Sequence, residues 1–230
     1  MPSPTPTILL DLDGTIIDSQ PGILSSCRAA LCALGHVPEP SLDISALIGP
    51  PIDDIMRVLL EPYRDNRVAE AVEAYRADYG RSGLFKSTPY PGIAQALADM
   101  QRAGAQLLLA TSKRRTFAQR ILEHLDLAAA FVGIHGSEAG AALDHKPELI
   151  AHVIARHGLT ASRCVMVGDR RYDIAGAHAN RMPALGVLWG YGSRDELEGA
   201  GADDLVAEPD ALAKAALAMV GASYISGPVR

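Results

Sequence analysis

Ile8-Leu9-Leu10-Asp11-Leu12-Asp13-Gly14-Thr15 is the stretch on which the interpretation of the whole chain depends. Its first three residues are apolar without polar alternation, which is typical of a strand buried on both faces. Two acidic residues, Asp11 and Asp13, follow this run. The pattern therefore predicts a buried strand that delivers two carboxyl groups to its carboxyl end.

The same pattern occurs twice more along the chain. Leu107-Leu108-Leu109-Ala110 is followed by the polar residues Thr111 and Ser112. Cys164-Val165-Met166-Val167 is followed, after one glycine, by Asp169. We therefore predict three strands that each end at polar side chains.

Helical patterns separate these runs from residue 91 onward. Two of the helical patterns end at a glycine, Gly104 and Gly158, as helices commonly do. Residues 131–134 and 184–188 fit two further strands. Repeating units of strand and helix predict an α/β fold with a doubly wound parallel sheet.

Residues 16–88 have a different pattern. They carry helical spacings, such as Val68 and Val72, but no convincing strand, and several prolines divide them into short helices. We therefore predict a helical subdomain of residues 16–88, inserted into a core of residues 1–15 and 89–230.

The composition argues against several kinds of partner. The chain of 230 residues is 48% hydrophobic and has a formal net charge of -6, so it has no basic excess for binding a nucleic-acid polymer. No stretch approaches the roughly 20 apolar residues of a membrane span. The first seven residues also lack the basic and apolar segments of a signal peptide. We expect a cytoplasmic protein that acts on a small molecule.

Polar residues from the three best strands are expected in one crevice. In open α/β sheets, ligands bind beyond the carboxyl ends of the strands. Carboxylates crowded there raise one another's pKa unless a cation lies among them, and oxygen ligands without His or Cys favour Mg²⁺ over zinc. The candidate metal residues are Asp11, Asp13, Asp169 and Asp173. The last of them is also placed to act as a charge at a helix N-terminus.

Asp11 and Asp13 have a spacing suited to covalent catalysis at phosphorus. Residues i and i+2 of an extended segment point to one side, so both carboxyl groups can face one phosphoryl group. Asp11 would attack phosphorus to give an aspartyl-phosphate. Asp13 would protonate the leaving oxygen and then activate water.

Phosphate binding is assigned to residues from three segments. Lys146, at the start of a predicted helix, supplies positive charge for the substrate phosphate and offsets the charge of the nucleophile. Thr111 and Ser112 donate hydrogen bonds to the phosphate, and Gly14 permits a tight turn. Thr111 and Lys146 thereby join the two aspartates as candidate catalytic residues.

In their order, these motifs resemble the four signatures of the haloacid dehalogenase-like superfamily over nearly the whole chain. The matching segments are Asp11-Leu12-Asp13-Gly14-Thr15, Thr111, Lys146-Pro147 and Gly168-Asp169-Arg170-Arg171-Tyr172-Asp173. The resemblance implies a Rossmann-like core and a mobile helical cap. It also implies Mg²⁺ held by Asp11, the main-chain carbonyl of Asp13 and Asp169, with Asp173 supporting the site.

The position of the cap indicates a branch of this superfamily. A cap between the first two signatures is found in the branch that includes phosphoglycolate phosphatase and β-phosphoglucomutase. Ala110-Thr111-Ser112-Lys113 and residues 186–193 are most similar to phosphoglycolate phosphatases and 5′-nucleotidase-like members. A dehalogenase is disfavoured, because dehalogenases of the superfamily lack the carboxyl group that Asp13 supplies.

The resemblance thus implies a Mg²⁺-dependent, phosphoglycolate phosphatase-like hydrolase of small phosphorylated metabolites. Three alternatives stay open: a 5′-nucleotidase acting on nucleoside monophosphates, a phosphomutase, and a non-catalytic regulator that binds a phosphorylated metabolite. Gly49-Pro50-Pro51, Arg57, Tyr75 and Arg76 could face substrate from the cap, but tyrosines at helical spacing favour a packing role over substrate contact. Both a monomer and a homodimer fit the sequence.

Overall fold

A computed structural model describes residues 5–138 and 143–221 of the chain. The central sheet has six strands in the order β5-β4-β1-β6-β7-β8, and all of its pairings are parallel. These strands are β1 (Thr7–Leu10), β4 (Gln106–Arg114), β5 (Gly133–Ser137), β6 (Cys164–Gly168), β7 (Ala184–Val187) and β8 (Asp204–Val206). The predicted α/β fold with a doubly wound parallel sheet is confirmed.

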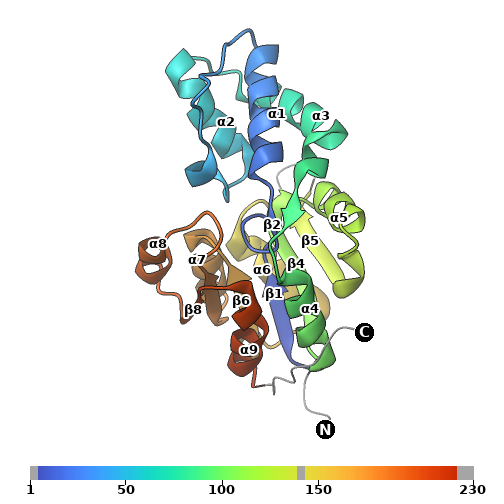
Figure 1. Ribbon diagram of the computed structural model, residues 1–230. Helices are drawn as coiled ribbons and strands as arrows, with labels where there is room; N and C mark the ends of the chain where they lie inside the picture. Colours follow the sequence, from blue (N-terminus) through green and yellow to red (C-terminus); the bar gives the residue numbers. More distant parts are fainter. Residues whose placement is uncertain (1–4, 139–142, 222–230) are drawn as a thin grey trace.

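Helices cover both faces of this sheet (Figure 1). One layer contains α4 (Ile93–Arg102), α5 (Arg115–His124) and α9 (Pro209–Met219). The other contains α6 (Lys146–His157), α7 (Arg171–Ala179) and α8 (Arg194–Gly199). Ile8 and Leu10 of β1 pack into the first layer and Leu9 into the second. Two buried faces explain why β1 is apolar without alternation.

Strand β1 lies between β4 and β6, and the three strands run in register. Leu10 is aligned with Leu109 of β4 and with Val167 of β6. The chain leaves β1 for β4 and β5, then returns to β6 on the other side of β1. This reversal at β1 creates the crevice in which ligands of such sheets bind.

Residues between β2 (Ile17–Asp18) and β3 (Thr88–Pro89) form helices above the carboxyl edge of the sheet (Figure 1). We call α1 (Gln20–Ala33), α2 (Ile52–Leu60) and α3 (Val68–Arg81) the cap helices. Short 3₁₀ turns also occur, at η1 (Ser45–Leu47), η2 (Glu61–Tyr63), η3 (Gly83–Lys86), η4 (Ala128–Ala130) and η5 (Ala161–Arg163). β2 and β3 pair antiparallel, so the chain enters and leaves the cap helices side by side.

The structure corrects the sequence predictions at several strands. The ribbon of β2 and β3 lies where no strand was predicted, because two paired residues are too few to show a periodicity. β4 continues to Arg114, with an irregularity in its pairing to β5 after Thr111. Thr111 therefore lies within the strand and not beyond its end. β8 carries the exposed Asp204 and has no apolar run that would reveal it.

None of the helices in the described parts of the chain is both long and apolar enough to cross a membrane.

Candidate active site

A cleft with a volume of about 70 Å³ lies where the cap helices meet the carboxyl edge of the sheet. Core residues that line it include Asp11, Asp13, Thr111, Ser112 and Lys113. A larger groove of about 650 Å³ adjoins it and shares several lining residues, including Ser112. Residues predicted to follow two separate strands therefore meet at one cavity.

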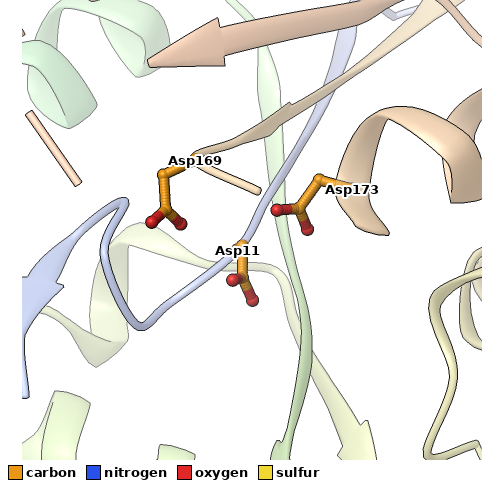
Figure 2. Close-up of side chains that lie close together, drawn as sticks. All are labelled: Asp11, Asp169 and Asp173. Carbon is orange, nitrogen blue, oxygen red and sulfur yellow. The ribbon is translucent and has the colours of Figure 1, made fainter. Parts of the chain in front are cut away.

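Three carboxyl groups converge beside this cleft (Figure 2). Asp11 follows β1, Asp169 follows β6 and Asp173 lies in the first turn of α7. All three are buried, and they offer oxygen atoms that lie within 4.8 Å of one another. Burial raises the pKa of Asp11 to about 6, although Lys146 opposes the shift. Burial, together with the charges of Asp173 and Asp11, raises the pKa of Asp169 well above its usual value.

Lys146 is the cation in contact with this cluster. Its Nζ lies 2.8 Å from Oδ1 of Asp11 and 2.5 Å from Oδ1 of Asp173, and it donates a hydrogen bond to the Ala110 carbonyl at 2.8 Å. The side chain is only 3% exposed. Burial alone would lower its pKa, but Asp11 and Asp173 reverse this effect and raise it. Lys146 is therefore a buried ammonium that holds the candidate nucleophile.

Asp169 is oriented by the loop that follows Asp11. Thr15 Oγ1 donates a hydrogen bond to Asp169 Oδ1 at 3.2 Å, and the Tyr191 N–H donates one to Oδ2 at 2.7 Å. Gly14 has a φ of 82°, and a Cβ there would lie 2.1 Å from Asp169 Oδ2. Only glycine accommodates both this backbone conformation and this close approach.

The carboxyl group of Asp13 contacts a different cation. Its Oδ1 accepts a hydrogen bond from Lys113 Nζ at 2.6 Å, and the same Nζ lies 2.7 Å from the hydroxyl of Tyr79 on α3. The structure thus brings three of the four predicted metal residues together through their side chains. Asp13 was predicted to bind the metal through its main-chain carbonyl, and this metal contact stays a prediction.

Thr111 and Ser112 lie at the cleft, as the sequence predicted. Thr111 is 1% exposed, and its Oγ1 accepts a hydrogen bond from the Lys113 N–H at 3.2 Å. Ser112 lines the cleft together with Asp11 and Asp13. Asp173, besides its contact with Lys146, accepts a hydrogen bond from the N–H at the start of α7. It therefore caps its helix and belongs to the acidic cluster.

The predicted cap residues separate into two groups. Gly49-Pro50-Pro51, Tyr75 and Arg76 line the cleft with Asp11. Arg57 lies outside the lining of the cleft and forms an exposed ion pair with Asp54. The sequence favoured packing for Tyr75; it is buried, and it also contributes to the cleft wall.

Sequence reasoning gave no role to two cations at this site. Lys113 stands two positions after Thr111, and the alternation of an extended strand would have placed both on one side. Arg170 donates hydrogen bonds to the carbonyls of Ile48 and Ala46, the latter at 3.2 Å. These partners are main-chain atoms that lie 122 and 124 residues away in sequence. No local pattern reveals such a contact.

The chain is similar to several known proteins. A family model described as haloacid dehalogenase-like hydrolase matches residues 8–187. Over 195 residues, or 84% of this chain and 86% of the relative, the chain is 39% identical to a 5′-nucleotidase from Pseudomonas aeruginosa. It is 38% identical over 192 residues to the tyrosine-protein kinase PtkA from Mycobacterium tuberculosis, where the match covers 83% of this chain but 65% of that longer relative.

Two further proteins are similar over most of their length. A phosphoglycolate phosphatase from Cupriavidus necator is 28% identical over 214 residues, which cover 91% of this chain and 92% of the relative. A solved structure, a predicted phosphatase from Clostridium acetobutylicum, is 34% identical and superposes with a TM-score of 0.85. That match covers 94% of this chain and 100% of the other.

Proposed function

The chain belongs to the haloacid dehalogenase-like hydrolase family, and we propose that it hydrolyses small phosphomonoesters through an aspartyl-phosphate at Asp11. The family and the phosphatase class predicted from the sequence are both confirmed. The covalent step, the metal and the substrate are the proposal that follows.

The observation that carries the proposal is the setting of Asp11. Its carboxyl group lines the cleft, one of its oxygens lies 2.8 Å from the Lys146 ammonium, and the residue is 5% exposed. A carboxylate that is removed from water but still held by a cation is a nucleophile with a fixed direction. Lys146 also supplies positive charge to the phosphoryl group that Asp11 would attack.

Asp11 and Asp13 both take part in each of the two half-reactions. In the first, an oxygen of Asp11 forms a bond to phosphorus, the bond from phosphorus to the leaving oxygen breaks, and that oxygen takes a proton from Asp13. In the second, water attacks the aspartyl-phosphate, Asp13 takes a proton from the water, and the bond from phosphorus to Asp11 breaks. Asp13 therefore acts as the general acid in the first half-reaction and as the general base in the second.

The acidic cluster fits a divalent cation. Asp11, Asp169 and Asp173 are buried within 4.8 Å of one another, with a single lysine in contact with two of them. Oxygen ligands of this kind suit Mg²⁺. We propose Asp11, Asp169 and the main-chain carbonyl of Asp13 as its ligands, with Asp173 in support. Bound there, Mg²⁺ would neutralise charge on the phosphoryl group.

The residues that line the cleft indicate which substrates it can accept. Tyr75, Tyr79 and Phe117 line it beside the catalytic residues. Aromatic walls suit a substrate with a planar apolar part, such as a nucleobase. We therefore place nucleoside monophosphates before phosphoglycolate as substrates.

Phosphate release from a substrate panel tests this function. The panel contains nucleoside monophosphates, phosphoglycolate and sugar phosphates, each with Mg²⁺ or EDTA. We expect turnover that needs Mg²⁺ and is lost in Asp11→Asn, because the amide is a poor nucleophile of nearly equal size. Asp204→Asn, at an exposed position of β8, is the matched control and should behave as wild type.

Each of the other outcomes would favour a different function for this chain. Undiminished hydrolysis by Asp11→Asn would contradict the assignment of the nucleophile. Isomerisation of a sugar phosphate with little free phosphate would favour the phosphomutase alternative. Tight binding of a phosphorylated ligand by the wild type without turnover would favour the regulatory alternative.

A further inference from the structure

Lys113 is a second buried lysine, and it contacts both the core and the cap helices. It lies near the end of β4, and its side chain is 6% exposed. Its Nζ donates hydrogen bonds to Asp13 Oδ1 at 2.6 Å and to the hydroxyl of Tyr79 at 2.7 Å. Burial alone would lower the pKa of Lys113, but the Asp13 charge and the Tyr79 contact reverse this and raise it. Lys113 is therefore an ammonium that faces the proposed acid and base.

Tyr79 makes the position of the Lys113 side chain depend on the cap helix α3. It belongs to α3, and its side chain is fully buried. Its ring stacks on Tyr75 of the same helix at 5.2 Å between centroids and meets the edge of Phe117 at 5.5 Å. Phe117 belongs to the core helix α5. The Tyr79 hydroxyl thus reaches Lys113 because α3 lies against α5 and the end of β4.

Resting on the proposed function, we infer that Lys113 is a positioning residue that fixes the direction of the Asp13 carboxyl group at the cleft, and that Tyr79 fixes Lys113 there when the cap covers the cleft. The contact of 2.6 Å engages one carboxyl oxygen of Asp13 and leaves the other to exchange a proton. A carboxyl group held in this direction can take the proton of the attacking water in the second half-reaction.

That half-reaction balances without any further reactant. The water oxygen forms a bond to phosphorus, and its proton passes to the second carboxyl oxygen of Asp13. The bond between phosphorus and the Asp11 oxygen breaks, and its electron pair returns to the Asp11 carboxylate. Asp13, now protonated, holds the proton that the leaving oxygen of the next substrate takes. Lys113 itself transfers no proton in this cycle.

The two buried lysines have separate partners, which makes the inference specific. Lys146 contacts Asp11 and Asp173, and Lys113 contacts Asp13. Loss of Lys113 should therefore slow the release of phosphate from Asp11 more than the formation of the aspartyl-phosphate. An enzyme impaired in this way accumulates the phosphorylated form.

Rapid mixing of the Mg²⁺-loaded enzyme with p-nitrophenyl phosphate separates the two half-reactions. Nitrophenolate leaves without needing a proton, so its release reports attack by Asp11 alone. For Lys113→Met we expect a burst of one nitrophenolate per enzyme and then a steady rate about 10- to 100-fold below wild type. Acid-quenched protein should retain the phosphoryl group. Tyr79→Phe, which keeps the ring, should show the same pattern with a smaller loss.

Matched controls come from the segment between β2 and β3. Lys86→Met removes an exposed lysine that hydrogen bonds Ser25, and Tyr63→Phe removes a hydroxyl that donates to the Val37 carbonyl. Lys86 and Tyr63 do not line the cleft. Both variants should reproduce the wild-type time course.

Four results would overturn the inference. Lys113→Met and Tyr79→Phe would do so if they matched the wild type, or if they slowed the first nitrophenolate release as much as the steady rate. A wild type that released no nitrophenolate would overturn the proposed function and this inference together. Turnover that needs Asp11 but shows no burst in either variant would overturn this inference alone.

Discussion

Lys146 and Lys113 differ in where their partners lie: those of Lys146 lie in the core, and those of Lys113 lie in both the core and the cap. Both lysines are buried, and carboxylates raise the pKa of both despite burial. Lys146 contacts partners in the core, namely Asp11, Asp173 and the Ala110 carbonyl. Lys113 has one partner in the core and one on α3. The nucleophile and the acidic cluster are thus positioned by the core, and the acid and base by the junction of core and cap.

Two other contacts connect the acidic cluster with the cap helices. Arg170, next to Asp169, donates to main-chain carbonyls in the segment before α2. Tyr191 donates through its N–H to Asp169 and through its hydroxyl to Asp18 of the ribbon. These contacts attach the cap to the core around the cluster, whereas Lys113 extends the attachment to Asp13.

The largest difference between the two lysines is expected in stability. Lys146→Met leaves two buried carboxylates without their cation, and removal of one partner of such a pair costs about 3–5 kcal/mol. Lys113→Met should cost less, because the Asp13 side chain is 12% exposed and keeps some contact with water. Urea unfolding of the two variants in EDTA measures both values. Equal losses would contradict the distinction between the two lysines.

The next largest effect concerns Gly14, on the core side of the comparison. Gly14→Ala places a Cβ against Asp169 and should weaken Mg²⁺ binding about 10- to 100-fold, as loss of an orienting contact does. Gly104→Ala is the matched control, because Gly104 has a φ of 83° and no atom within 4 Å of an added Cβ. Calorimetric titration with Mg²⁺ compares them. Unchanged affinity in Gly14→Ala would argue against Asp169 as a ligand.

The smallest effect is the pH dependence of stabilisation by Mg²⁺. The pKa of Asp11 in the metal-free protein is raised from 3.8 to about 6, so a proton competes with the metal below that pH. At saturation of about 100 times Kd, Mg²⁺ should stabilise the fold by about 2.7 kcal/mol near neutral pH. The gain should fall by about 1.4 kcal/mol one unit below the pKa.

Thermal melts with and without Mg²⁺ at the two pH values measure this difference. The sign follows from the raised pKa: stabilisation by the metal is complete above pH 6 and is lost as the pH falls. Asp204→Asn should retain the same dependence as wild type. Equal stabilisation at both pH values would place the metal away from Asp11.

The sequence predicted the core side of this comparison well. Asp11 and Asp169 follow strands of a parallel sheet, and Lys146 begins a helix packed on that sheet. A doubly wound fold brings such positions to one edge of the sheet. Even there, the end of β4 was wrong, because its last residues are polar and carry an irregularity that hydrophobic patterns do not record.

The cap side was less accessible to sequence reasoning. Tyr79 shows the helical spacing of a packing residue, and its contact with Lys113 depends on how α3 lies against the core. Helical periodicity gives the direction of a side chain relative to its own helix, but not the placement of that helix on another domain. The contact between Tyr79 and Lys113 therefore emerged from the structure alone.

The most direct test of the account is to find the phosphoryl group on the protein. Turnover by the Mg²⁺-loaded enzyme is quenched in acid, the protein is digested, and the peptides are weighed by mass spectrometry. The account predicts one added phosphoryl group on the peptide that contains Asp11, with more of it in Lys113→Met than in wild type. A phosphoryl group on another residue of the cleft, such as Ser112, or on none, would contradict it.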